Sequence, residues 1–169
     1  MNSRPCPVCG TTDKHPKLMI EHHFEGDTYE VKCPVCGPFV MSEKAIGELN
    51  QRGIDDRSIL SGWIRERQIA RATPPDIKSS DYKRKPEEAG RFLLPEILES
   101  HAPKSVSARL DRALRNLIAL SGEPGNPVTY SPDDRSLFFC STPDRVVYYL
   151  KGMLARGWLE QCAFKAFGQ

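Results

Sequence analysis

The pentapeptide Cys-Pro-Val-Cys-Gly occurs twice in this chain, at residues 6–10 and 33–37. In each copy, two cysteines separated by two residues are followed by a glycine, whose backbone freedom allows a tight turn with both sulfurs directed at one ion. Two such turns supply four thiolates, the ligand set of a closed structural zinc site. We therefore predict one structural Zn²⁺ ion, bound by Cys6, Cys9, Cys33 and Cys36.

Two other roles exist for a pair of cysteines with this spacing. A redox-active pair opens a helix after a strand in a βαβ setting, and neither copy has that context. Free thiols without a shared function are the second alternative. The histidines between the copies, His15, His22 and His23, are predicted not to bind the ion, because four cysteines already complete the site.

Three short segments around the cysteines have the composition of strands. Residues 18–20 and 28–32 are separated by Glu25-Gly26-Asp27, which favours a hairpin, and residues 38–41 follow as a third strand. We predict a zinc ribbon over residues 1–51 that includes a short helix beginning near Ser42. Because so few large apolar side chains lie in this region, the metal is expected to contribute directly to folding.

The composition indicates where the protein is located and how its charge is distributed. The chain has no apolar run of about 18 residues and no signal-peptide core, so we predict a cytoplasmic protein without a membrane span. The formal net charge is +2, but residues 1–51 contain five basic and seven acidic side chains. Four metal-bound thiolates would make the ribbon still more negative, which makes it a poor candidate for contacts with a phosphate backbone.

The middle of the chain is predicted to connect two domains. Residues 52–72 form a helical connector, and residues 73–91, rich in proline and serine, form a linker. Arg67 falls within the apolar stripe of the connector, where it either extends to solvent or pairs with an acidic group of the ribbon. That stripe consists of Ile59, Leu60, Trp63, Ile64 and Ala70.

Residues 92–169 are predicted to form a winged-helix-like domain, which makes the fold class α+β. A helix begins at Ser105, and a second helix begins at residues 141–144 and ends at Gly157. Strands are predicted between and after these helices, at residues 128–130, 137–140 and 158–164. The apolar face of the first helix consists of Val106, Leu110, Ala113, Leu114, Leu117 and Ile118. Cys140 and Cys162 are predicted to be buried as small apolar residues.

In a winged helix, the helix before the wing enters the major groove of DNA. Its predicted exposed face offers four residues for DNA contact: Arg145, Tyr148, Lys151 and Arg156. That face has no asparagine, glutamine or serine for reading bases, so any DNA binding is expected to be non-specific. The alternative is that the module packs against or binds other proteins.

The two CPVCG copies, the segment RSILSGWIRE at residues 57–66 and the block 105–160, with Tyr149-Leu150 and Gly157-Trp158-Leu159, resemble the N-terminal part of certain uncharacterised bacterial proteins. In those proteins a zinc ribbon and a winged-helix-like module precede an effector domain that is sometimes TIR-like, and a role in anti-phage defence is suspected. The resemblance implies an effector after Gln169, so the chain is either a fragment with a truncated wing or a stand-alone relative.

The sequence contains no Ser/His/Asp group, phosphate-binding glycine loop, HExxH motif or paired-carboxylate motif. We therefore predict a non-catalytic sensor, adaptor or regulatory module that acts through a protein partner, an effector domain or non-specific DNA contacts. The first alternative is a DNA-binding transcriptional regulator. The second is the regulatory part of a nucleotide-hydrolysing effector enzyme.

Overall fold

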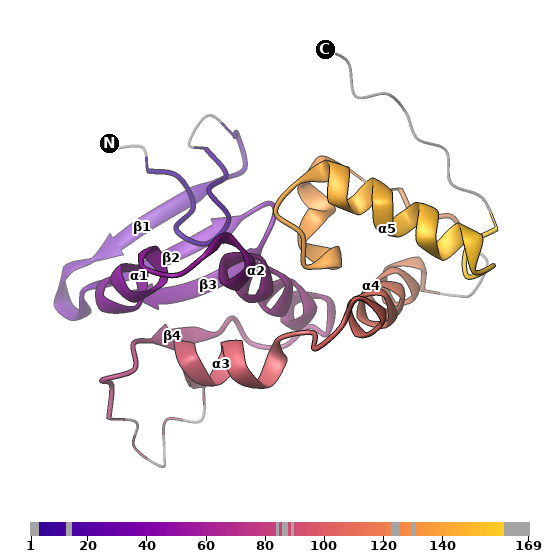
Figure 1. Cartoon of the computed structure of the whole chain (residues 1–169). Coiled ribbons are helices and arrows are strands. Elements are labelled where there is room, and N and C mark those ends of the chain that lie inside the picture. The colour runs from indigo at the N-terminus through magenta and orange to yellow at the C-terminus, as the bar shows by residue number, and fades with distance from the viewer. Residues whose placement is uncertain are drawn as a thin grey trace.

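The computed structural model describes residues 4–12, 15–83, 85, 88, 90–122, 126–129 and 131–160. It is a mixed α+β structure, in agreement with the predicted class (Figure 1). The elements follow in this order: β1 (Met19–His23), η1 (Phe24–Gly26), β2 (Thr28–Cys33), β3 (Gly37–Ser42), α1 (Glu43–Asn50), α2 (Ile54–Ile69), β4 (Asp76–Lys78), β5 (Arg91–Leu93), α3 (Leu94–His101), α4 (Val106–Ser121), η2 (Pro132–Phe138) and α5 (Pro143–Ala155).

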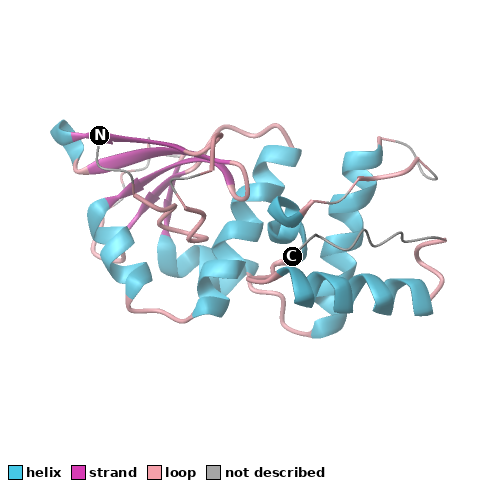
Figure 2. Ribbon diagram, turned by 90° about the horizontal axis from the view of Figure 1, so that it is seen from above, coloured by secondary structure: helices cyan, strands magenta, loops and turns pink. Residues whose placement is uncertain are grey.

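One five-stranded sheet contains all the described strands, in the order β1-β2-β3-β4-β5. The first three are antiparallel, as the ribbon prediction requires, and Val31 of β2 lies opposite Phe39 of β3. Alternate residues of β2 and β3 are buried, which is the pattern of a sheet with one covered face. Helices cover that face, and the other face is open (Figure 2).

The segment predicted as a linker, residues 73–91, departs from that prediction. Residues 76–78 form β4, which pairs in parallel with β3, and Arg91 begins β5. Ile77 is fully buried, and Lys78 is buried beside Asp76, with 2.8 Å between the ammonium nitrogen and a carboxylate oxygen. The sheet thus extends beyond the predicted ribbon, because one buried isoleucine and two parallel pairings hold this segment in place.

Helix α2 is the central element of the structure rather than a simple connector. Its residues from Ser58 to Ile64 are all buried, and it contacts the sheet, α3, α4 and η2. Ala70, predicted as part of the apolar stripe, lies after the helix end and is exposed. Among the described residues, Arg67 forms no ion pair with an acidic group of the ribbon. Its guanidinium lies over the rings of Phe92 and Trp63, 4.7 and 5.3 Å from their centroids, and donates a hydrogen bond of 3.2 Å to the exposed carbonyl of Thr73.

The C-terminal helices enclose a second core, which differs from the predicted one. Val106 and Ile118 of α4 are exposed rather than buried. Asn116 of α4 is buried and donates a hydrogen bond of 3.0 Å to the carbonyl of Leu137. The buried residues of this core are Leu110, Ala113, Leu117, Leu137, Phe138, Cys140, Val146, Tyr149, Leu150 and Met153. Cys140 is thus buried as predicted, and Cys162 lies outside the described residues.

The strand predicted at residues 137–140 is wrong, because Leu137 and Phe138 complete the 3-10 helix η2. Four consecutive residues from Leu137 to Cys140 are buried, so the segment has no exposed face to alternate with a buried one. Between Leu94 and Glu160, the described residues form no strand. The winged-helix prediction is therefore not confirmed.

Candidate metal centre

The four cysteines of the two CPVCG copies lie together in the structure. Each offers a sulfur, and the four sulfurs lie within 4.8 Å of one another. The Cys6 and Cys36 sulfurs are 3.9 Å apart, and those of Cys9 and Cys33 are 3.5 Å apart. A tetrahedral ion with metal–sulfur bonds of about 2.3 Å needs sulfurs about 3.8 Å apart, whereas a disulfide needs about 2.0 Å. The spacing therefore fits a metal ion and excludes disulfides between these pairs.

Two backbone turns position the sulfurs. In the first, Gly10 donates a backbone hydrogen bond of 2.9 Å to the carbonyl of Cys6. The second turn joins β2 to β3 and ends at Gly37. Gly10 and Gly37 have φ values of 71° and 98°, which other residues adopt only with strain. The glycine that follows each cysteine pair is thus required by the turn.

Two hydroxyl groups outside the cluster lie within hydrogen-bond distance of its sulfurs. The Thr11 hydroxyl lies 3.0 Å from the Cys9 sulfur, and the Ser61 hydroxyl of α2 lies 3.2 Å from the Cys36 sulfur. Hydrogen bonds of this kind orient thiolate ligands and stabilise their negative charge. Neither Thr11 nor Ser61 is among the site residues predicted from the sequence. The sequence does contain one indication of a role for Ser61, because it is a small polar residue in the apolar middle of a predicted helix.

Hydrogen bonds between the cysteine thiols shift their pKa values. Hydrogen bonds from Cys33 and Cys36 lower the pKa of Cys9, and a hydrogen bond from Cys36 lowers the pKa of Cys33. Burial raises the pKa of Cys36, so this thiol resists ionisation without a nearby positive charge. A divalent ion at the centre of the cluster would supply that charge. Cys140, which is outside the cluster, has a pKa raised to about 12 by burial.

The second cysteine turn is joined to the C-terminal half of the chain. The buried hydroxyl of Ser136 in η2 donates a hydrogen bond of 2.5 Å to the carbonyl of Val35, which lies between two of the cysteines. Arg135 donates to the hydroxyl of Thr11 at 3.3 Å, next to the first turn. Both turns of the candidate metal centre are therefore in contact with η2.

We expect Ser136→Ala to reduce the free energy of unfolding by about 1–3 kcal/mol, because the buried carbonyl of Val35 loses its partner. Ser107→Ala on the exposed surface of α4 is the control, with an expected change of less than about 0.5 kcal/mol. Denaturant titration of the two variants measures the difference. Equal losses would show that the Ser136 hydrogen bond does not stabilise the fold.

The group of sulfurs that lie within 4.8 Å of one another includes no described histidine. The His22 ring stacks on Tyr29, with 4.5 Å between the ring centroids, and His23 lies 3.6 Å from a carboxylate oxygen of Glu30. Two further sets of side chains come within 4.8 Å of one another: Glu21, His23 and Glu30, and His22, Asp27 and Glu43. Both sets contain exposed carboxylates, which are common on protein surfaces without a metal, so they support no assignment.

The residues predicted to contact DNA all lie on α5 or at its C-terminal end. Arg145 forms an ion pair with Asp55, with 3.2 Å between nitrogen and oxygen. The guanidinium of Arg156 lies 5.4 Å from the ring centroid of Trp158. The side chains of Tyr148 and Lys151 are exposed. Among the described residues, Arg145 is therefore the one of these four that has a charged partner.

Comparison of the chain with protein-family models, curated proteins and solved structures finds no match. Among the described helices, none is both long and apolar enough to cross a membrane.

Proposed function

We propose that this protein is a non-catalytic regulatory module that holds one structural Zn²⁺ ion and binds a partner protein through helices α4 and α5. The buried four-sulfur cluster supports this proposal most strongly. Four thiolates in tetrahedral spacing suit Zn²⁺, and they leave no open position for a water molecule or a substrate. Such a site stabilises a fold instead of performing a reaction.

The contacts between the cluster and η2 give the metal a role in arranging the C-terminal helices. The Ser136 hydroxyl binds the second cysteine turn, and η2 packs against α4 and α5. Arg65 of α2 adds an ion pair to Asp134 of η2, with 3.0 Å between nitrogen and oxygen. A metal ion that holds the turns in place would therefore also fix the position of α4 and α5.

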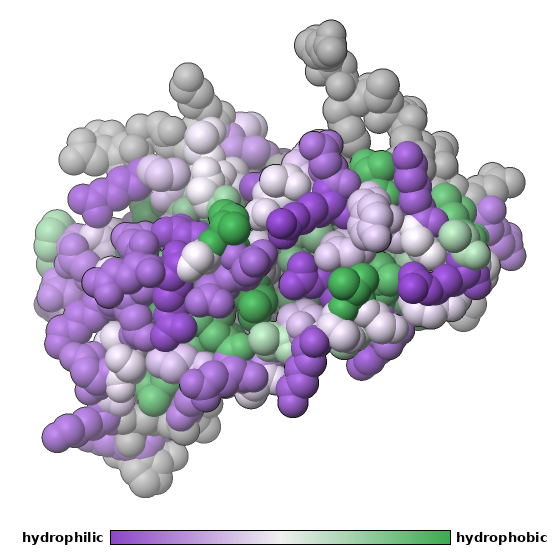
Figure 3. Space-filling model, viewed as in Figure 1, coloured by the Kyte–Doolittle hydropathy of each residue, from purple (hydrophilic) through white to green (hydrophobic). Residues whose placement is uncertain are grey.

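Helices α4 and α5 border a groove of about 580 Å³ with an apolar lining. Val106 and Tyr148, which both line this groove, are 56% and 70% exposed. Contiguous exposed apolar surface of this kind marks sites of protein interaction. Figure 3 shows apolar residues, in green, interrupting the polar surface where α4 and α5 lie. Lys151 and Arg156 are the charged residues among the described residues that line it. The groove is therefore suited to an acidic, amphipathic segment of another protein.

DNA fits this surface less well. Arg145 is paired with Asp55, and the described part of the chain has no wing to add phosphate contacts. Apolar side chains such as Val106 and Tyr148 add little to binding of a phosphate backbone, whereas they contribute to a protein interface. The resemblance to defence proteins suggests a setting for such an adaptor, and that setting stays a prediction.

Fluorescence anisotropy with three labelled probes tests the proposal. These are an amphipathic peptide with leucine and glutamate at helical spacing, the same peptide with lysine replacing glutamate, and a short DNA duplex. We expect the acidic peptide to bind most tightly, and Tyr148→Ala and Lys151→Glu each to weaken it about tenfold. Lys17→Glu, the same charge change on the ribbon surface, is the control and should leave the affinity unchanged.

Two results would contradict this function. Equal affinity for the acidic and basic peptides would show that the charge of the groove does not select a partner. Tighter binding of the duplex, with a steep loss between low and moderate salt that Lys151→Glu reduces, would instead support the DNA-binding alternative.

A further inference from the structure

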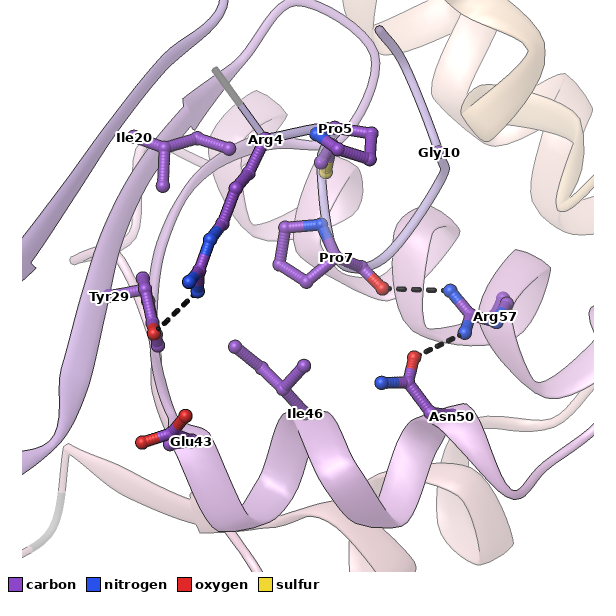
Figure 4. Close-up of a pocket in the computed structure, with 11 residues that line it drawn as sticks. Arg4, Pro5, Pro7, Gly10, Ile20, Tyr29, Glu43, Ile46, Asn50 and Arg57 are labelled. Atoms are coloured by element: carbon purple, nitrogen blue, oxygen red, sulfur yellow. Dashed lines mark hydrogen bonds between the residues drawn. The ribbon is translucent and has the colours of Figure 1, made fainter. Parts of the chain in front are cut away.

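A cavity of about 370 Å³ lies beside the first cysteine turn, between that turn, the sheet and α1 (Figure 4). It is independent of the groove between α4 and α5. Its volume is within the range of small-molecule sites, which begins at about 300 Å³. Pro7 of the turn, Tyr29 of β2 and Ile46 of α1 are among the residues that line it. The cavity therefore joins three parts of the ribbon that are distant in sequence.

The cavity is positively charged at two places. Figure 4 shows Arg4 and Arg57 on either side of Ile46. Arg57 is held in place, because it donates hydrogen bonds of 2.9 Å to the Pro7 carbonyl and 2.6 Å to the Asn50 side chain. Glu43 is the one acidic residue among the described residues that line the cavity. The two arginines and one glutamate have a formal charge of +1, and Cys6, which also lines the cavity, belongs to the cysteine cluster. The attraction for an anionic group therefore comes from the two arginines.

Arg4 is the group most available to such a ligand. It donates one hydrogen bond of 2.9 Å to the Tyr29 hydroxyl, and its guanidinium lies 5.7 Å from the centroid of that ring. Among the described residues, no carboxylate lies within ion-pair distance of it. A guanidinium has five N–H donors arranged to bind a carboxylate through two parallel hydrogen bonds. Several donors of Arg4 therefore remain for a ligand, and the contact with Tyr29 holds the group at the cavity.

The rest of the lining is suited to an apolar body. Ile20, Ile46, Pro5 and Pro7 present aliphatic surface to the cavity. We infer that the cavity is a binding site for a small organic carboxylate with an apolar body, held by Arg4 and Tyr29 at the carboxylate and by Ile46 and the prolines along its body. A free phosphate would leave these apolar side chains without a partner. A bound acid would also contact the cysteine turn, so this site would give the proposed regulatory module a ligand to sense.

Two-dimensional ¹H–¹⁵N NMR of the full, metal-loaded chain tests the inference, with 4-phenylbutyrate as the probe and 4-phenylbutyramide as its uncharged control. We expect saturable shifts at the amides of Gly10, Ile46 and Asn50, with a dissociation constant on the order of 1 mM for an acid of this size. The amide and the Arg4→Gln variant should each weaken binding about tenfold, because each removes the ion pair. Lys17→Gln, an equal loss of charge elsewhere on the ribbon, should have no effect.

A second arm distinguishes the two sources of such a carboxylate. N-acetyl-Leu-Phe with a free C-terminus is compared with its amidated form. Binding about tenfold tighter than that of phenylbutyrate would identify the C-terminal residue of a peptide as the ligand, and weaker binding would identify a free small acid. The inference is overturned if no probe gives saturable shifts at the cavity, if acids and amides bind equally, or if Arg4→Gln binds like the native chain. Spectra that overlay away from the cavity show that the variant is folded.

Discussion

Cys36→Ser is expected to abolish stoichiometric metal binding and to unfold the ribbon. The Cys36 sulfur is fully buried, so a serine there replaces a charged ligand with a hydroxyl that binds Zn²⁺ weakly and cannot reach water. Structural zinc sites contribute about 10–16 kcal/mol of apparent binding free energy at neutral pH, and this is more than the whole stability of many domains. If the cluster holds such an ion, as proposed, removing one of its four ligands removes much of the free energy that folds the ribbon.

The effect should extend beyond the ribbon. Val35 next to Cys36 accepts the hydrogen bond of Ser136, and Ser61 of α2 contacts the Cys36 sulfur. When the turn is lost, η2 loses its contact with the cysteines, and α2 loses a neighbour along its buried middle. We therefore expect loss of chemical-shift dispersion for α2 and η2 as well as for the strands, and the same loss when a chelator removes the metal.

Metal analysis by mass spectrometry, with circular dichroism and ¹H–¹⁵N NMR spectra of the same samples, measures the outcome. Cys140→Ala is the matched control, because Cys140 is also buried but lies outside the cluster. It should retain one equivalent of metal and lose about 1 kcal/mol of stability or slightly more, as small cavities do. If Cys36→Ser keeps both its metal and its melting temperature, the four sulfurs are not the ligands of a structural ion.

The cysteine centre was predictable because its information is local. Each CPVCG copy contains two ligands and the glycine that its turn needs, so only the meeting of the two turns depends on the fold. The antiparallel strands were predictable for the same reason, since short turns connect them. Ser61 and Ser136 were not predictable, because each contacts the cysteine turns from another part of the chain, 25 and 101 residues away along the sequence.

The predictions that were wrong concern segments whose structure depends on contacts with residues distant in the sequence. Residues 76–78 pair in parallel with β3, and nothing near them in sequence indicates that pairing. The apolar run from Leu137 to Cys140 is equally compatible with a buried strand and a buried helical turn. Ser131 and Asp134 offered the missing signal, because they form a capping box with Pro132 in the first turn, a typical helix start.

The second large change in stability is expected from a substitution at Gly62, in the middle of α2. A glycine within a helix usually lowers the stability of that helix by about 1 kcal/mol relative to an alanine, so Gly→Ala in a helix normally stabilises a protein. At Gly62, however, an added Cβ would lie 2.3 Å from a ring carbon of Phe139. Phe139 is fully buried, has a left-handed backbone with φ of 54°, and carries the guanidinium of Arg112 against its ring at 4.3 Å. The ring therefore has little room to move.

We expect Gly62→Ala to lower the free energy of unfolding by about 2 kcal/mol, because overpacking outweighs the gain in helix propensity. Gly47→Ala in α1 is the matched control, since a Cβ added there meets nothing within 4 Å. This substitution should raise the free energy of unfolding by about 0.5–1 kcal/mol. Denaturant titration of both variants gives opposite signs for the same substitution. Adding Phe139→Leu to Gly62→Ala should cost less than the two single changes predict together, because the smaller side chain makes room for the methyl group. Stabilisation at both glycines would show that α2 and Phe139 are not in close contact.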